Sequence, residues 1–123
     1  EIPIGIEVQT RHIEANLYEV VLHMRVEAKS QSMQLFLIEI AYGALCTIHV
    51  PEQHLQPVLL VEVPRLLFPF VRSLIADLTR DGGFPPLLVT PIDFAELYRQ
   101  RLAQMQAQQA QQTQAPPEGA TVN

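Results

Sequence analysis

Apolar and polar side chains alternate with a period of two along most of the first half of the chain. In "IPIGIEVQ" at 2–9, Ile4, Ile6 and Val8 fall on one side and Glu7 on the other. The alternation recurs in "NLYEVVLHMRVEA" at 16–28 and in "MQLFLIEIAYGALCTIHV" at 33–50, after a link at 11–14 and the polar turn "KSQS" at 29–32. Successive side chains of a strand point to opposite faces of a sheet, so three strands are predicted, the last two joined as an antiparallel hairpin. The final "LCTIHV" either continues the third strand or folds back as a further one.

The alternation also divides the predicted strands into a dry face and a mixed face. The dry face takes Tyr18, Val20, Leu22, Met24, Val26, Phe36, Ile38, Ile40 and Tyr42. The mixed face takes Leu17, Glu19, Val21, His23, Arg25, Glu27, Leu35, Leu37, Glu39 and Ala41. Antiparallel sheets commonly bury one face and leave the other in water, so the mixed face is expected to be solvated.

Helical spacing replaces the alternation after Pro51. A short helix is predicted at about 52–61, because proline and glutamate suit the start of a helix. In "PRLLFPFVRSLIADLTRDGGFPP" at 64–86, apolar residues recur every three or four positions, namely Val71, Leu74, Ile75 and Leu78. Proline restricts the residue before it, so Pro69 predicts a break or kink near Phe68. Gly82 is the expected end of this helix.

The last predicted helix is "PIDFAELYRQRLAQM" at 91–105, with Asp93 in its first turn. Its apolar stripe is Phe94, Leu97, Tyr98 and Leu102. Beyond it, seven of the thirteen residues 103–115 are glutamine. This composition predicts a folded domain at 1–102 and a disordered tail at 103–123. Strands followed by helices indicate the α+β class with an antiparallel sheet.

Composition narrows the function classes. The formal net charge of −5 argues against nucleic acid, since phosphate binding needs a basic patch. Residues 1–63 carry eight acidic and three basic side chains, which suits a basic partner. The 48% of hydrophobic residues can build a core, but a small domain leaves apolar surface uncovered, so assembly is expected. Cys46 is the only cysteine, which fits a reducing compartment, and no apolar run reaches the ~18 residues of a membrane span.

No residue pattern points to catalysis. The four histidines lack metal-ligand spacing, no serine lies in a G-x-S-x-G turn, and "DGG" at 81–83 follows a helix rather than a strand. Glu19 and Glu39 on neighbouring strands form the one conceivable acid/base pair, but solvated positions on the mixed face are the stronger interpretation. Cys46 is interpreted as a small core residue. The prediction is a protein that is not an enzyme, without metal or cofactor.

Several stretches resemble the SecB family of bacterial protein-export chaperones. The most specific are "YEVVL" at 18–22, "LLFPF" at 66–70 with Arg72, "GFPPL" at 83–87 and "PIDFAELY" at 91–98, and the resemblance covers nearly all of 2–102. The "RDGGFPP" stretch is similar to alphaproteobacterial members. The resemblance implies a four-stranded antiparallel sheet with helices on one face, assembled as a dimer of dimers. It also implies a cytoplasmic, ATP-independent holder of unfolded precursors that hands them to the SecA translocation ATPase.

The resemblance further implies roles for particular residues. Leu37 and Glu39 match SecA-contacting positions, and Ile4, Ile6 and Val8 match the strand that borders the client groove. Positions matched to packing and assembly are Ile38, Ile40 and Tyr42, to which the apolar helix adds Phe70 and Leu74. The family has a further strand and an aromatic crossover before residue 1, and the sequence is expected to lack both.

Two other functions stay open at this point. One is a SecB-like chaperone dedicated to a single toxin, and SecA binding through Leu37 and Glu39 would discriminate against it. The other is an enzyme with a small-molecule pocket, for which no nucleophile, metal or cofactor pattern is present.

Overall fold

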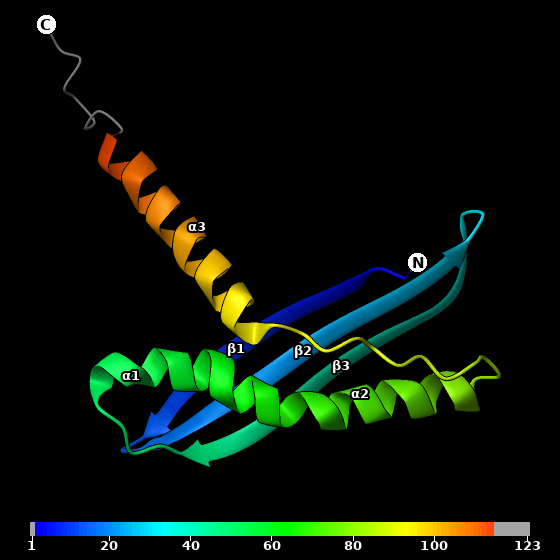
Figure 1. Ribbon diagram of the computed structural model, residues 1–123, viewed down its shortest axis with the longest axis horizontal. Helices are drawn as coiled ribbons and strands as arrows, with labels where there is room; N and C mark the ends of the chain where they lie inside the picture. Colours follow the sequence, from blue (N-terminus) through cyan, green and yellow to red (C-terminus); the bar gives the residue numbers. More distant parts are fainter. Residues whose placement is uncertain (1, 115–123) are drawn as a thin grey trace, which may run out of the picture.

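A three-stranded antiparallel sheet forms one layer of the molecule, and helices cover one of its faces (Figure 1). The computed structural model describes residues 2–114. The strands are β1 (Ile4–Glu14), β2 (Leu17–Ser30) and β3 (Met33–Thr47), in the spatial order β1-β2-β3. This confirms the predicted α+β class, and within residues 2–114 the sheet has three strands where the resemblance implied four in the family. Of the two alternatives for "LCTIHV", its first residues continue β3 as far as Thr47.

The predicted link at 11–14 is wrong, because these residues extend β1. Arg11 and His12 pair with Glu19 and Tyr18, and the register shifts only between His12 and Glu14. The chain then reverses within two residues, with Ala15 at a φ of 45°. Stacking of the His12 ring on Tyr18, at 4.7 Å between ring centroids, favours this close pairing up to the turn.

The two faces of the sheet are those that the alternation predicted. Val20, Leu22 and Val26 on β2 are fully buried and Met24 nearly so. The residues opposite them extend this inner face onto the neighbouring strands, with Ile4, Ile6, Val8 and Thr10 on β1 and Ile38, Ile40, Tyr42 and Ala44 on β3. The opposite side of the sheet is called the outer face below. On β2 it carries Glu19, Val21, His23, Arg25 and Glu27.

A single long helical segment covers the inner face. It consists of α1 (Glu52–Pro57), the wide π-helical turn η1 (Val58–Glu62) and α2 (Val63–Asp81), with no loop between them. Of the break or kink predicted near Phe68, the break is wrong, because α2 passes through Phe68 and Pro69. Phe68 is buried edge-on against Phe94, at 6.0 Å between ring centroids, and this packing holds the helical conformation despite the proline.

The irregular turn of this helical segment precedes Pro64, whereas the sequence predicted an irregularity at Pro69. Pro64 occupies the second position of α2, and the wide turn η1 ends just before it. A proline ring clashes with the carbonyl four residues back in a regular helix, and a wider turn relieves that clash.

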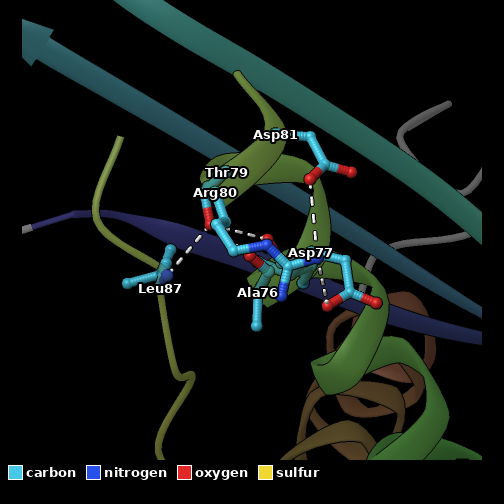
Figure 2. A network of polar contacts seen from close by, with 7 residues as sticks. Ala76, Asp77, Thr79, Arg80, Asp81 and Leu87 are labelled. Carbon is cyan, nitrogen blue, oxygen red and sulfur yellow. Dashed lines mark hydrogen bonds and ion pairs between the residues drawn. The ribbon is translucent and has the colours of Figure 1, made fainter. Parts of the chain in front are cut away.

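Hydrogen bonds to α2 hold the segment that leads out of it (Figure 2). Gly82 caps the helix as predicted, and Gly83 follows with a φ of 90°, while Phe84 N–H donates to the Thr79 carbonyl at 3.0 Å. The buried Thr79 hydroxyl donates to the Ile75 carbonyl at 2.8 Å and accepts from Leu87 N–H at 2.9 Å. Farther along, Arg72 Nε donates to the Val89 carbonyl at 2.8 Å. The extended residues 84–93 are therefore fastened along α2.

The last helix, α3 (Phe94–Gln114), is attached at its beginning and then projects away from the sheet (Figure 1). Asp93 Oδ1 accepts from Glu96 N–H at 3.0 Å, so Asp93 is the N-cap rather than a first-turn residue. Phe94 is buried, and every residue from 99 to 112 is exposed. Residues 103–114, predicted to be disordered, are helical, because alanine and glutamine favour helix. The rest of the predicted tail, 115–123, lies outside the described residues, and the division at residue 102 stays a prediction.

Within the described part of the chain, no helix combines the length and apolar character that crossing a membrane requires.

Replacing Thr79 tests the fastening of 84–93. Thr79→Val keeps the side-chain shape and removes the hydroxyl, so the Leu87 N–H loses its acceptor. We expect the free energy of unfolding to fall by about 1–2 kcal/mol. Thermal melting monitored by circular dichroism measures this, with the exposed Thr90→Val as the matched control. Equal melting temperatures for both variants would contradict this account of Thr79.

Candidate functional site

The outer face of the sheet carries the two residues matched to SecA contact. Leu37 and Glu39 lie side by side on β3, with the Leu37 residue 39% and the Glu39 side chain 64% exposed. Arg25 faces Glu39 across the strands, and its guanidinium lies 3.6 Å from the Glu39 carboxylate and 3.7 Å from that of Glu27. An exposed apolar side chain thus adjoins exposed charges.

The ion pairs of the outer face leave Glu19 and Glu27 partly covered and Glu39 more accessible. Arg11 contacts Glu19 at 3.3 Å and Lys29 contacts Glu27 at 3.8 Å, with the basic side chains more than half exposed. Exposed pairs of this kind contribute only about 0–1 kcal/mol each and are screened by salt. A basic partner can therefore compete for the Glu39 carboxylate, the most exposed of the three, at little cost to the fold.

Small residues hollow the centre of the outer face. Gly5 on β1 and Ala41 on β3 flank Arg25 and His23, and the hollow between them has a volume of about 520 Å3. His23 Nε2 lies 3.0 Å from the Gln9 side-chain oxygen, and the Gln9 amide donates to Glu7 at 3.0 Å. The hollow is shallow and open, so it suits a surface contact rather than an enclosed ligand.

The three residues matched to the client groove lie together on the inner side of β1. Ile4 is 37% exposed, and Ile6 and Val8 are half-buried. A second hollow of about 480 Å3 adjoins them, between β1 and the start of α3. Its lining combines apolar and polar side chains, namely Ile6, Glu7, Val8, Leu60, Leu97, Tyr98, Gln100, Arg101 and Gln104.

The residues matched to assembly divide between the sheet and the surface of α2. Ile38, Ile40 and Tyr42 are half-buried on the inner side of β3. Phe70 and Leu74 are exposed on α2, and the Phe70 ring stacks on Tyr42 at 6.1 Å between centroids. The four apolar residues that the sequence placed on one stripe of this helix divide between two environments. Val71 and Ile75 are buried, whereas Leu74 and Leu78 are exposed. The exposed apolar residues of α2 together form one apolar surface, made of Leu66, Phe70, Leu74 and Leu78.

Two features of the described residues had no signal in the sequence. The first is a hollow of about 370 Å3 at the end of α2, where Phe84 packs edge-on against Phe36 at 5.0 Å and Leu37 and Glu39 form one wall. The second is a hydrogen bond from Arg101 on α3 to the Val8 carbonyl of β1, at 3.1 Å. Both depend on the path of the chain after Gly82, which residue patterns do not specify.

The described residues offer little to support catalysis. Glu19 faces Leu45 whereas Glu39 faces Arg25, six positions apart along β3, so their carboxylates are separated by about 20 Å. The conceived acid/base pair is therefore wrong. Burial raises the pKa of the half-buried Cys46 thiol, which lowers its thiolate fraction at neutral pH. Across residues 2–114, no group of three or more metal-ligating side chains comes together.

Comparisons with known proteins agree with the motifs. A family model described as preprotein translocase subunit SecB matches residues 1–105. A protein-export protein SecB of Paramagnetospirillum magneticum is 55% identical over 111 residues, which cover 90% of this chain and 72% of that protein. One of Rhodospirillum rubrum is 45% identical over 123 residues, covering all of this chain and 73% of the relative.

A solved structure shares the fold at low sequence identity. It is a SecB-like chaperone of Mycobacterium tuberculosis in complex with a ChAD peptide from an antitoxin. The two folds superpose with a TM-score of 0.65 over 75% of this chain and 72% of that chain, at 18% identity. This likeness supports the α+β architecture.

Proposed function

The chain belongs to the SecB family, and from that membership we propose that it is a chaperone which holds unfolded precursor proteins in an export-competent state. In this proposal it works in the cytoplasm without ATP and delivers its clients to the SecA translocation ATPase. It is not an enzyme, and release of a client requires a competing partner rather than a chemical step. The protein-export names of the relatives support the export role.

The observation that carries the proposal is the amount of apolar side chain left in water. Leu66 and Phe70 on α2 are 70% and 58% exposed, although the described residues bury a core of fifteen side chains. On β1, Ile4 is exposed, and Ile6 and Val8 line an open hollow beside α3. Exposed apolar surface of this extent is typical of binding sites for other proteins. The part of this surface on β1 makes non-directional contacts and so can accept many sequences, whereas the part on α2 suits a second copy of the chain.

We assign the client to the inner side of β1 and SecA to the outer face. Ile4, Ile6 and Val8 offer apolar contact, whereas Leu37 and Glu39 combine an exposed apolar side chain with accessible negative charge. The sheet separates these two surfaces, so both partners can be bound at once. SecA can then dock while the client is still held, and compete for the client from that position.

The apolar surface on α2 is assigned to assembly. Leu66, Phe70, Leu74 and Leu78 are exposed on one helix, and Tyr42 extends this surface onto β3. A second copy of the chain covers the same surface in a homotetramer built as a dimer of dimers. The alternative of a chaperone for a single toxin is not adopted, because the likeness to the mycobacterial complex carries the fold alone.

The test of the proposed function is client refolding without nucleotide. An unfolded precursor diluted into buffer with equimolar protein should refold several-fold more slowly than alone, because the chaperone competes for its exposed apolar segments. Intrinsic fluorescence of the client measures the rate, with serum albumin as the control. Unchanged refolding in the presence of the purified chain would remove the proposed function.

Two substitutions should separate the working surfaces. Glu39→Lys reverses a charge at the rim of a contact, so it should weaken SecA binding about tenfold at low salt and leave client holding intact. Ile6→Asp puts a carboxylate into the apolar groove and should weaken client holding while SecA binding persists. Calorimetry with SecA and with an unfolded client measures both. The reverse result, with Glu39→Lys abolishing client holding alone, means that the faces are assigned the wrong way round.

A substitution on α2 tests assembly. Phe70→Asp places a charge in the contact between copies, so tetramers should dissociate into smaller species, while the half-exposed site lets each copy stay folded. Light scattering after size exclusion measures the mass, with Gln53→Asp on exposed α1 as the matched control. A Phe70→Asp variant with the mass of the unaltered tetramer would contradict this assignment, as would a monomeric unaltered protein at micromolar concentration.

A further inference from the structure

Within the described residues, β1 is an edge strand, and the edge that it turns away from β2 carries no further strand. In the sheet order β1-β2-β3 it pairs only with β2, and no other strand within residues 2–114 lies along it. Its Val8 carbonyl instead accepts a hydrogen bond from the Arg101 guanidinium of α3, at 3.1 Å. A side chain thus occupies a place that a neighbouring strand would take.

That hydrogen bond reveals which backbone groups point outward. In an antiparallel pair, residues alternate between those bonded to the partner strand and those whose N–H and C=O both point away from it. Val8 lies opposite Leu22, and its carbonyl bonds outside the pair. The register is regular from Ile4 to His12, so Ile4, Ile6 and Thr10 share the orientation of Val8.

The outward backbone groups and the groove side chains therefore belong to the same residues. Ile4, Ile6 and Val8 present apolar side chains to the inner face and backbone donors and acceptors to the open edge. An unpaired edge of this kind is a template for another extended chain. The hollow beside it has apolar walls from Leu60 and Leu97, which can receive side chains on that side.

We propose that an unfolded client binds by adding its backbone as an extra strand to the open edge of β1, and that Arg101 is the latch that occupies this edge in the absence of client. The inference rests on the proposed chaperone function and specifies how the client is held. Backbone hydrogen bonds are the same for every sequence, so this mode needs no sequence motif in the client. Alternate client side chains enter the groove, and those between them lie toward the outer face.

The attachment of α3 suits a latch. Phe94 is buried and Leu97 and Tyr98 are half-buried, but the helix is exposed from Arg99 onward. Beyond the first turns of α3, the Arg101 hydrogen bond ties the helix to the sheet edge. An incoming strand donates a backbone N–H to the Val8 carbonyl in place of the Arg101 guanidinium, so the free energy of that hydrogen bond changes little. The other outward backbone groups of β1 gain a strand partner in place of water, which favours binding.

Backbone methylation of a peptide tests strand addition on the unaltered protein. The probe is a fluorescein-labelled ten-residue peptide in which valine and phenylalanine alternate with threonine and lysine. The apolar residues fix which side faces the groove. N-methylation of either the apolar or the polar residues removes the donors of one edge only. The peptide methylated on the edge that meets β1 should bind at least about tenfold more weakly than the parent peptide, and the other should bind nearly as well. If the client strand adds antiparallel to β1, the weakened peptide is the one methylated on its apolar residues.

Variants of the protein give an independent readout by fluorescence anisotropy. Ile6→Pro removes an outward N–H, which edge strands tolerate, and Ile6→Ala is the matched loss of side chain. The proline variant should bind the parent peptide about tenfold more weakly than the alanine variant. Arg101→Leu frees the Val8 carbonyl and should bind the peptide several-fold more tightly than the unaltered protein.

The possible results separate this inference from the proposed function. If refolding is slowed but both methylated peptides bind alike, the chaperone function stands and strand addition is wrong. If neither refolding nor the parent peptide is affected by the protein, the proposed function itself fails. If Ile6→Pro dissociates the assembly and leaves peptide affinity unchanged, the edge pairs with a second copy of the chain, which also overturns the inference.

Discussion

The packing of α2 on β2 is the contact on which the rest of the structure depends. Val20, Leu22 and Val26 on the sheet and Val71 and Ile75 on the helix are all fully buried, and together they form the centre of a two-layer core. One helix is narrower than a three-stranded sheet, so the residues that flank this seam stay partly in water. The same seam positions Phe70 outward on α2 and Ile6 beside the groove. The binding surfaces are thus the margins of the core rather than separate additions to it.

Much of the sheet could be predicted because its pattern is binary. A residue on β2 belongs either to the face with Leu22 or to the face with His23, and a shift of one position would reverse every assignment at once. This is why Leu37 and Glu39 could be assigned to the outer face from sequence alone, and the exposure of both agrees with it. Their contact with SecA is a prediction that rests on resemblance.

The parts that could not be predicted depend on distant residues. Helical dihedrals at Phe68 follow from its packing on Phe94, twenty-six positions later, which overrides the local preference before Pro69. The Thr79 hydroxyl that holds Leu87 and the Arg101 guanidinium that reaches Val8 are ordinary polar residues in the sequence. The different exposure of Ile75 and Leu74 on α2 could not be predicted either, because it depends on the width of the sheet, which covers Ile75 and leaves Leu74 exposed. Such contacts carry no periodicity, so pattern analysis has nothing to detect.

A chaperone that works without chemistry must balance its own stability against that of its complexes. Burying two or three large client side chains contributes about 3–9 kcal/mol, before the entropic cost of ordering the client. The protein can offer that energy only by leaving apolar residues of the groove, such as Ile4, partly uncovered in its own fold. Covering them permanently would stabilise the chain and abolish binding. The proposed latch on α3 is a compromise between the two, because a helix that is exposed from Arg99 onward can shield the groove and still give way to a client.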